Sequence, residues 1–418
     1  MLAWALFDAS LAPFSVLVVT VGYSTYFKEI VAGGARSGDF LWGLASSISM
    51  LLVAVTAPIL GAHADRTATK RPFLIAATAL MVVCTALLAT VGPGMVVLGM
   101  FLFILANVGF QGGQVFYNAF LPEVSAEQTL GRVSGFSFAM GYAGALISLA
   151  AALPYYRHAG GAGDPIPGRG LFLVAALGTA MVALPTLLFL RDAPRPTADP
   201  DTESGGPPWR ETVDRLRRTL SDLRRQRNAF RFLLAYLVYM DAISTMIAFT
   251  AIYARTTIGL SLSTIVALFL VSQLTAIPGA LVFGRLADRV GAKPTISGIL
   301  GLWILILILA LLARGLSMFL VVGLLAGVGT GSLQAVSRSM MSQLSPRDRQ
   351  AEFFGFYAVA GRVSAVIGPV LFGGLSTLTG NQRIAIGALA VMIAVALLLL
   401  QRVGRPGRLA GVPAEAKV

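Results

Sequence analysis

Charged residues are scarce in this chain, and their scarcity limits what the protein can be. Asp, Glu, Lys and Arg make up 12% of the 418 residues, hydrophobic residues make up 56%, and the mean hydropathy is +0.79. A soluble domain carries roughly a quarter charged residues. Apolar runs of about 20 residues, the length that a helix needs to cross a bilayer, recur along the whole sequence. Because these runs do not alternate as barrel strands do, we expect a helical, multi-pass membrane protein embedded in a lipid bilayer.

Cysteine and histidine are nearly absent, which removes most metal and nucleophile chemistry from consideration. The single cysteine, Cys84, lies in an apolar run, so the sequence offers neither a disulfide framework nor a cysteine-based metal site. The two histidines, His63 and His158, are far apart in the sequence. No phosphate-binding loop of the Walker type is present. We therefore expect no cofactor, no metal and no enzymatic activity.

Twelve apolar segments are expected to span the membrane. The first does not resemble a removable signal peptide, since no basic residue precedes Trp4 and Asp8 interrupts its apolar part. The expected spans are 3–27, 40–61, 73–91, 95–118, 131–153, 171–190, 229–254, 263–284, 295–313, 317–340, 351–375 and 384–401.

The net charge of +13 is distributed unevenly about these spans. With both termini on one side, 23 of the 32 Lys and Arg fall on the side of the termini, seven fall on the other, and Arg338 and Arg362 lie within spans. Basic residues accumulate in cytoplasmic loops, so both termini are expected in the cytoplasm. This distribution accounts for the basic charge, and no nucleic-acid partner is expected.

One long polar stretch, 191–228, divides the spans into an N-terminal bundle (1–190) and a C-terminal bundle (229–402), which a tail (403–418) follows. Its first part is rich in Pro, Gly and acidic residues and indicates a flexible linker. Its second part has apolar residues at helical spacing opposite a face rich in Arg: Trp209, Val213, Leu216, Leu220 and Leu223. This pattern favours an amphipathic helix on the cytoplasmic membrane surface, and a fully solvated helix is the alternative.

The two halves repeat each other. GAHADRTATKRP (61–72) recurs as GRLADRVGAKP (284–294), and 107–125 aligns with 327–345 at a constant offset of 220 residues. The same offset relates Gly141 to Gly361, and Asp8 has a looser counterpart in Asp241. Parallel six-helix repeats are an architecture of secondary transporters, in which the substrate site lies near the bilayer midplane between the halves.

The two loop sequences resemble the Gly-x-x-x-Asp-Arg signature of the major facilitator superfamily, in the loops where that family carries it. Four further stretches narrow the resemblance: WALFDAS, FYNAFLPEVS, LQAVSRSMMSQLSP and FFGFYAVAGRVSAVIGP. They are similar to a branch that includes the fungal vacuolar amino-acid effluxers linked to autophagy and many bacterial relatives. The resemblance covers essentially the whole chain.

The resemblance implies an all-α membrane protein of twelve transmembrane helices in two pseudo-symmetric six-helix bundles. It implies a secondary carrier that moves amino acids or similar small polar solutes by alternating access. A drug or lipid-like exporter on the same fold is the alternative function. We expect a monomer in a bacterial inner membrane.

Two charges are expected near the bilayer midplane of the C-terminal half. Asp241 lies about 18 Å into the seventh span and Arg362 about 16 Å into the eleventh, at about 1.5 Å per residue. An ionised group at this depth is unfavourable by roughly 2.5–3.5 kcal/mol or more, so a partner is expected. Either the two residues pair with each other, or they face the cavity and bind the ammonium and carboxylate groups of a zwitterionic substrate.

The fourth span carries a polar stripe whose spacings of four, three and four residues place its members on one helix face: Asn107, Gln111, Gln114 and Asn118. The stripe either faces a wet cavity or holds neighbouring helices together. Gln273 of the eighth span, Tyr142 of the fifth and Asn107 are expected near the depth of Asp241 and Arg362. The predicted substrate-binding residues are therefore Asp241, Arg362, Asn107, Gln111, Gln273 and Tyr142.

Asp8 in the first span is the other acidic residue within the membrane. A carboxyl group that alternates between an apolar and a cationic environment could carry a proton, so Asp8 and Asp241 are the candidates for proton coupling. The alternative for Asp8 is a fixed ion pair with Arg338 in a facilitative carrier.

The loop signatures predict a gate on the cytoplasmic side. Gly61 and Gly284 allow backbones to approach closely, and Asp65 and Asp288 can bind the positive N-terminus of a neighbouring helix, such as the eleventh or the fifth. Simple anchoring of the topology is the alternative. The predicted gating residues are Gly61, Asp65, Arg66, Gly284, Asp288, Arg289 and Arg338.

Overall fold

A computed structural model describes residues 1–20, 22–33, 37–159, 169–192, 226–363 and 367–404. Within them, twelve helical segments are long and apolar enough to cross a membrane, which confirms the expected number. Each expected span overlaps one of them, although several helices extend further, such as the first, which covers Leu2–Val31. The helix expected at 209–223 and the tail from 405 onward lie outside the described residues.

The N-terminal bundle contains the first six spans. Its main helices are α1 (Leu2–Pro13), α2 (Gly22–Tyr26), α3 (Ser37–Arg66), α4 (Arg71–Leu87), α5 (Val96–Ala119), α7 (Leu130–Ala159) and α8 (Gly170–Phe189), with a short α6 (Leu121–Val124) between α5 and α7. Two π-helical stretches, Phe14–Thr20 and Phe27–Val31, continue the first span on either side of α2.

The C-terminal bundle contains the other six spans. Its helices are α10 (Arg227–Thr256), α11 (Leu262–Val290), α12 (Ala292–Leu312), α13 (Leu316–Leu344), α14 (Gln350–Val363), α15 (Ile367–Thr379) and α16 (Gln382–Gln401). The eleventh span consists of α14 and α15. Local signals in the sequence define several ends: Ser261 and Asn381 cap α11 and α16 with side-chain oxygens, and Gly291, at a φ of +100°, makes the turn between α11 and α12.

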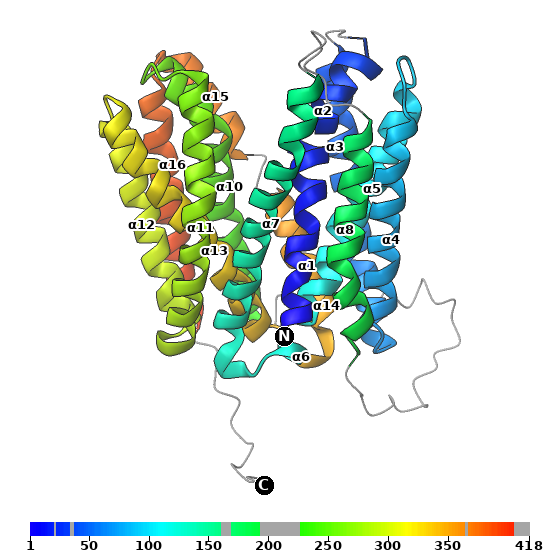
Figure 1. Ribbon diagram of the computed structural model, residues 1–418. Helices are drawn as coiled ribbons and strands as arrows, with labels where there is room; N and C mark the ends of the chain where they lie inside the picture. The colour runs from blue at the N-terminus through cyan, green and yellow to red at the C-terminus, as the bar shows by residue number, and fades with distance from the viewer. Residues whose placement is uncertain (21, 34–36, 160–168, 193–225, 364–366, 405–418) are drawn as a thin grey trace.

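The two bundles stand side by side, and α7 and α14 lie where they meet (Figure 1). The face at which α1 begins and α16 ends is called the terminal face below. Lys293 at the start of α12 donates to the backbone oxygens of Gln401 and Val403, and Gly404 N donates to Asn228 at the start of α10. These contacts place the starts of α10 and α12 beside the end of α16. With an even number of spans, the last span must end on the face at which α10 and α12 begin.

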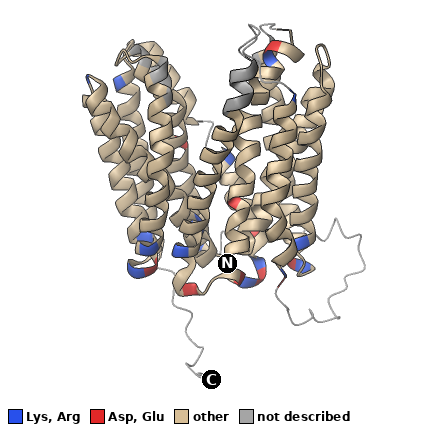
Figure 2. Cartoon of the chain, viewed as in Figure 1, with Lys and Arg blue, Asp and Glu red and all other residues tan. Residues whose placement is uncertain are grey.

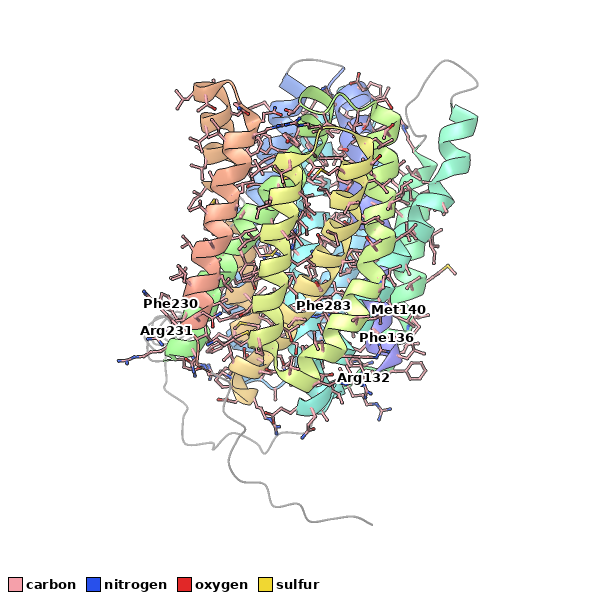
Figure 3. The ribbon with its side chains drawn as sticks, turned by 90° about the vertical axis from the view of Figure 1, so that its left-hand side faces the viewer. Arg132, Phe136, Met140, Phe230, Arg231 and Phe283 are labelled. Carbon is pink, nitrogen blue, oxygen red and sulfur yellow. The ribbon has the colours of Figure 1, made fainter. Side chains whose placement is uncertain are left out.

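Charge is concentrated at the terminal face and is sparse along the spans (Figure 2). Along α7, Met140, Phe136 and Arg132 follow one another toward that face at intervals of four residues (Figure 3). A row of apolar residues that is followed by a basic residue is typical of a helix whose end reaches the membrane surface. Other apolar side chains of the spans are exposed where lipid would cover them, such as Met181 of α8 and Val391 of α16, at 72% and 63%.

Candidate functional site

Arg338 of α13 reaches from the C-terminal bundle into the N-terminal bundle. Its Nη1 donates to Asp8 Oδ2 of α1 at 2.9 Å, and its Nε and Nη2 donate to the hydroxyl and carbonyl oxygens of Ser134 in α7, at 2.9 and 2.8 Å. Asn118 Oδ1 of α5 lies 3.3 Å from Nη1. The two charged side chains are 2% and 12% exposed. The ion pair between Asp8 and Arg338, which the sequence left as one of two alternatives, is therefore formed.

The rest of the Arg338 pocket also belongs to the N-terminal bundle. The rings of Trp4, Tyr117 and Phe138 lie 5.2, 5.6 and 4.0 Å from the guanidinium carbon, in the range of cation–π attraction. Ser137 Oγ donates to Asp8 Oδ2 at 2.6 Å and also contacts the Tyr117 hydroxyl. Sequence reasoning missed these residues, because an aromatic residue in an apolar span gives no signal of its partner.

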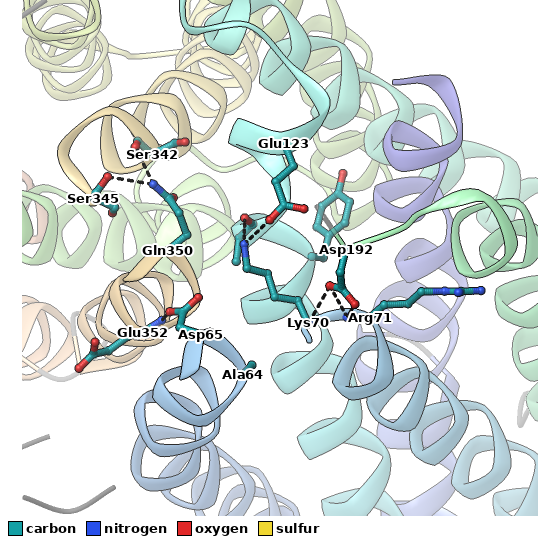
Figure 4. A network of polar contacts seen from close by, with 12 residues as sticks. Ala64, Asp65, Lys70, Arg71, Glu123, Asp192, Ser342, Ser345, Gln350 and Glu352 are labelled. Carbon is teal, nitrogen blue, oxygen red and sulfur yellow. Dashed lines mark hydrogen bonds and ion pairs between the residues drawn. The ribbon is translucent and has the colours of Figure 1, made fainter. Parts of the chain in front are cut away.

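Each loop aspartate binds the first turn of a helix in the other bundle. Asp65 Oδ2, at the end of α3, accepts the backbone N–H of Glu352 in α14 at 2.8 Å (Figure 4). Asp288, at the end of α11, accepts the N–H groups of Gly131 and Arg132 in α7 at 2.7 and 2.8 Å. These are contacts with the eleventh and fifth spans, and a carboxylate is favourable at a helix N-terminus.

The signature glycines lie where these helices touch. A Cβ on Gly61 would stand 2.6 Å from the carbonyl oxygen of Ala351, and a Cβ on Gly284 would collide with the carbonyl oxygen of Gly131. Both positions therefore require glycine for the bundles to close at the terminal face. Arg66 ends α3, and Arg289, in the last turn of α11, is exposed. A gating role for all these residues stays a prediction.

A second group of contacts braces the terminal face inside the N-terminal bundle (Figure 4). Lys70, 3% exposed, pairs with Glu123 at 2.6 Å and donates to the carbonyl oxygen of Ala119 at 3.1 Å. Asp192, after α8, accepts the backbone N–H groups of Lys70 and Arg71 at 2.8 and 3.1 Å. These bonds join α4, α6 and the end of α8 within the N-terminal bundle.

Farther from the terminal face, two polar contacts cross between the bundles. Arg362 Nη2 of α14 donates to Gln111 Oε1 of α5 at 2.5 Å, and the Tyr142 hydroxyl of α7 donates to Gln334 Oε1 of α13 at 3.2 Å. Tyr142 and Arg362 are related by the 220-residue offset of the repeat. Gln334, which sequence reasoning did not single out, occupies the position equivalent to Gln114. Three of the predicted binding residues, Arg362, Gln111 and Tyr142, thus take part in contacts between the halves.

Asp241 is not paired with Arg362. Both of its carboxylate oxygens accept the backbone N–H of Gly368, at 2.9 and 2.8 Å, and the residue is 1% exposed. Gly368 lies in the first turn of α15, where a helix leaves its N–H groups without helical partners. The sequence offered a pair between Asp241 and Arg362 as one alternative. This alternative is wrong for this conformation, because the carboxylate of Asp241 binds the backbone N–H of Gly368 instead.

The described contacts of the polar stripe of α5 join helices, which is one of the two alternatives that the sequence left open. Asn107, 3% exposed, donates to Ser49 Oγ of α3 at 2.6 Å and so joins helices within one bundle. Gln111 and Asn118 accept bonds from Arg362 and Arg338 of the other bundle. The stripe thus begins inside the N-terminal bundle and continues onto its interface.

Gln273 lies apart from these contacts, at a cavity of about 110 Å³ inside the C-terminal bundle. Residues of α10, α11, α12 and α13 line the cavity, whose walls are mainly apolar and include Phe269, Trp303 and Phe319. The buried indole N–H of Trp303 has no hydrogen-bond partner. Gln273 was expected near the depth of Arg362 as a binding residue, and no described contact joins the two side chains.

Metal ligation has no support in the part of the chain that the structure describes, since no group of three or more His, Cys, Asp or Glu side chains there could hold an ion. The chemistry of the site is instead that of hydrogen-bond donors, two interface arginines and amide groups. Such groups can form hydrogen bonds with a polar solute.

Three comparisons place the chain among known proteins. A family model described as "Vacuole effluxer Atg22 like" matches residues 41–130 and 125–406. An uncharacterised MFS-type transporter of Bacillus subtilis, YxiO, is 26% identical over 95% of this chain and 93% of its own length. Autophagy-related protein 22 of Coccidioides immitis is 24% identical over 54% of this chain, which spans only 41% of that fungal protein.

Solved structures of transporters share the fold. The human organic anion transporter MFSD10 superposes with a TM-score of 0.74 at 16% identity, over 96% of this chain and 98% of its own. The transporter FucP, in its outward conformation, superposes with a TM-score of 0.75 at 14% identity, over 97% and 98% of the two chains. At these identities the likeness concerns the arrangement of the helices alone.

Proposed function

The chain belongs to the Atg22-like family of vacuole effluxers within the major facilitator superfamily, and from this premise we propose that it is a secondary transporter of amino acids or similar small polar solutes. The observation that carries the proposal is the pair of polar contacts between the bundles, Arg362 with Gln111 and Tyr142 with Gln334. Polar groups at membrane depth that join two moving halves are suited to bind a solute in transit.

Alternating access requires contacts that break in one state and re-form in another. The structure is closed at the terminal face, where Asp8 pairs with Arg338 and the loop aspartates bind α7 and α14. Opening of this face would release all of these contacts together, because each one joins the two bundles. We propose that these contacts form the gate and that the terminal face is cytoplasmic, since basic residues gather there.

Proton coupling is the proposed source of energy, with Asp8 and Asp241 as candidate carriers. Protonation of Asp8 would remove the negative charge that faces Arg338 and so weaken the closed gate. Asp241 would act differently, through its bonds to Gly368 at the start of α15. A proton that binds either carboxylate would thus favour a change between conformations.

The test is uptake of labelled amino acids into proteoliposomes that contain the purified protein, with and without an imposed pH gradient. We expect saturable uptake that the gradient accelerates and that Arg362→Ala abolishes. The variant Arg231→Ala, at an exposed arginine of the terminal face (Figure 3), controls for the loss of a positive charge. Saturable uptake at the same rate with and without the pH gradient would refute proton coupling. Unchanged uptake by the Arg362→Ala variant would refute the role of Arg362 in substrate binding.

A drug or lipid-like solute is the second candidate substrate, favoured by the apolar cavity between α10, α11, α12 and α13. The same proteoliposomes separate the two candidates: an exporter of apolar compounds would transport lipophilic cations or dyes and no amino acid.

We also propose that the protein is a monomer in a bacterial inner membrane. Size measurement of the detergent complex and a fluorescent fusion to the C-terminus, which should emit from the cytoplasm, test these two points.

A further inference from the structure

Arg362 is only partly satisfied by the protein. Its Nη2 donates to Gln111, whereas its Nε and Nη1 are buried and have no hydrogen-bond partner. Buried polar groups are nearly always hydrogen-bonded, and a buried charge needs compensation most of all. The guanidinium therefore has capacity for an acceptor that this chain does not supply.

The acidic side chains of the neighbouring spans already have other partners. Asp8 binds Arg338, and Asp241 directs both oxygens to the N–H of Gly368. Among the described residues, no ion pair neutralises Arg362. Its nearest polar surroundings are neutral: Gln111, and the Tyr236 hydroxyl, which would lie 3.0 Å from a Cβ placed on the adjacent Gly361. The interface at this level thus carries a positive charge without a matching acid.

An ammonium group would meet the opposite situation. Asp241 is 1% exposed, and both of its carboxylate oxygens bind the N–H of Gly368 in α15. An ammonium could reach this carboxylate only by displacing the backbone of α15. The described interface therefore holds cationic donors that lack an acceptor, whereas the carboxylate of Asp241 already has a backbone partner.

We propose that the site recognises the carboxylate of its substrate through Arg362, with Gln111 holding the guanidinium, and that it does not require an amine. The substrate class is then small carboxylates with or without an α-amino group. This inference rests on the proposed transport function, whose site it makes more specific. The guanidinium is suited to the task, because it remains charged at any physiological pH and its planar donors match carboxylate oxygens.

The test measures binding rather than transport, by the thermal stabilisation of the purified full-length protein in detergent at neutral pH. The twenty common amino acids are screened first. The one that stabilises most is then compared with its deaminated and its decarboxylated analogue; for leucine these are 4-methylpentanoate and 3-methylbutylamine. We expect the amino acid and its deaminated analogue to bind within about tenfold of each other, and the amine to give no stabilisation.

Two variants assign the effect to the guanidinium. Arg362→Gln should raise the apparent Kd of both carboxylates at least about tenfold, which is about 1.4 kcal/mol. Arg231→Gln, at the terminal face, should leave both values unchanged. The comparison of analogues on the unmodified protein decides the question even where Arg362→Gln fails to fold.

Four results would overturn the inference: no stabilisation by any carboxylate, equal stabilisation by the amine, binding of the amino acid alone, or loss of amino-acid binding in Asp241→Asn with the deaminated analogue unaffected. Failure of the proposed function has a different signature, because carboxylates would then bind in detergent while no solute accumulates in proteoliposomes. The two failures are therefore distinguishable.

Discussion

The ion pair between Asp8 and Arg338 makes a quantitative prediction about conformation. Asp8→Ala would leave the Arg338 guanidinium, which is 2% exposed, facing only neutral oxygens of Ser134 and Asn118. Removal of one partner of a buried pair is unfavourable by about 3–5 kcal/mol. Because Asp8 is 12% exposed and some water reaches it, the lower end of this range applies.

The loss falls on one conformation only. All hydrogen-bond and ring partners of Arg338 found here belong to the N-terminal bundle, so the uncompensated charge exists only while the terminal face is closed. A change of about 3 kcal/mol lowers the ratio of closed to open molecules by more than about a hundredfold. The conformations of a working carrier differ by only a few kcal/mol, so the open state should become dominant.

Pulsed electron paramagnetic resonance between two spin labels measures this shift. Gln128 of the N-terminal bundle and Val290 of the C-terminal bundle are exposed at the terminal face and can carry the labels, after Cys84 is replaced by serine. We expect the distance distribution to move to longer values in Asp8→Ala. Asp192→Ala is the matched control, because it also removes a carboxylate that accepts hydrogen bonds, but the partners of Asp192 lie within one bundle.

The outcome that would refute the reasoning is an unchanged distance distribution in a folded Asp8→Ala protein. Replacement of both partners, Asp8→Ala with Arg338→Met, provides a second check. It removes the buried charge together with its partner, so the double variant should populate the closed state more than Asp8→Ala alone. If the two variants behave alike, the pair does not control the gate.

Three further predictions follow from individual contacts. Gly61→Ala should slow uptake and open the terminal face, because its methyl group would stand 2.6 Å from the backbone of α14, whereas Gly298→Ala, with no atom within 4 Å, should have no effect on uptake. Asp241→Ala should lower the free energy of unfolding by about 0.5–2 kcal/mol, as the loss of a helix cap does, and Asp241→Asn by less, as thermal melting would show. Tyr142→Phe should remove one neutral hydrogen bond to Gln334, worth about 0.5–1.5 kcal/mol. In the molecules that open, the distance between the bundles at that level should therefore be longer. Identical spin-label distance distributions for the variant and the unmodified protein would contradict this prediction.

Much of this architecture was predictable because each signal was local in the sequence. Apolar runs of bilayer length gave the twelve spans, and the recurrence of the Asp65 loop at Asp288 gave the two halves. The loop aspartates also indicated their targets, because a carboxylate after one helix has few favourable sites other than the N-terminus of another. The contacts of Asp65 with Glu352 and of Asp288 with Gly131 are of this kind.

The partners of the charges within the membrane were not predictable in the same way. The sequence required a partner for Asp241 and suggested Arg362, but a backbone N–H satisfies a carboxylate as well, and backbone groups leave no trace in a composition. The sequence likewise placed Gln273 and Arg362 near one depth. It contained no information on the rotation of each helix that sends one side chain to a cavity and the other to the interface.

The sequence by itself determined that this protein lies in a membrane, crosses it twelve times and consists of two related halves, because hydropathy and repetition are properties of the linear chain. Only the tertiary structure decided which charges meet: that Arg338 closes on Asp8, that Asp241 holds α15, and that two donors of Arg362 are left without an acceptor. The physical reason is that the energy of a buried charge depends on atoms within a few ångströms, and these come from spans that lie far apart in the chain.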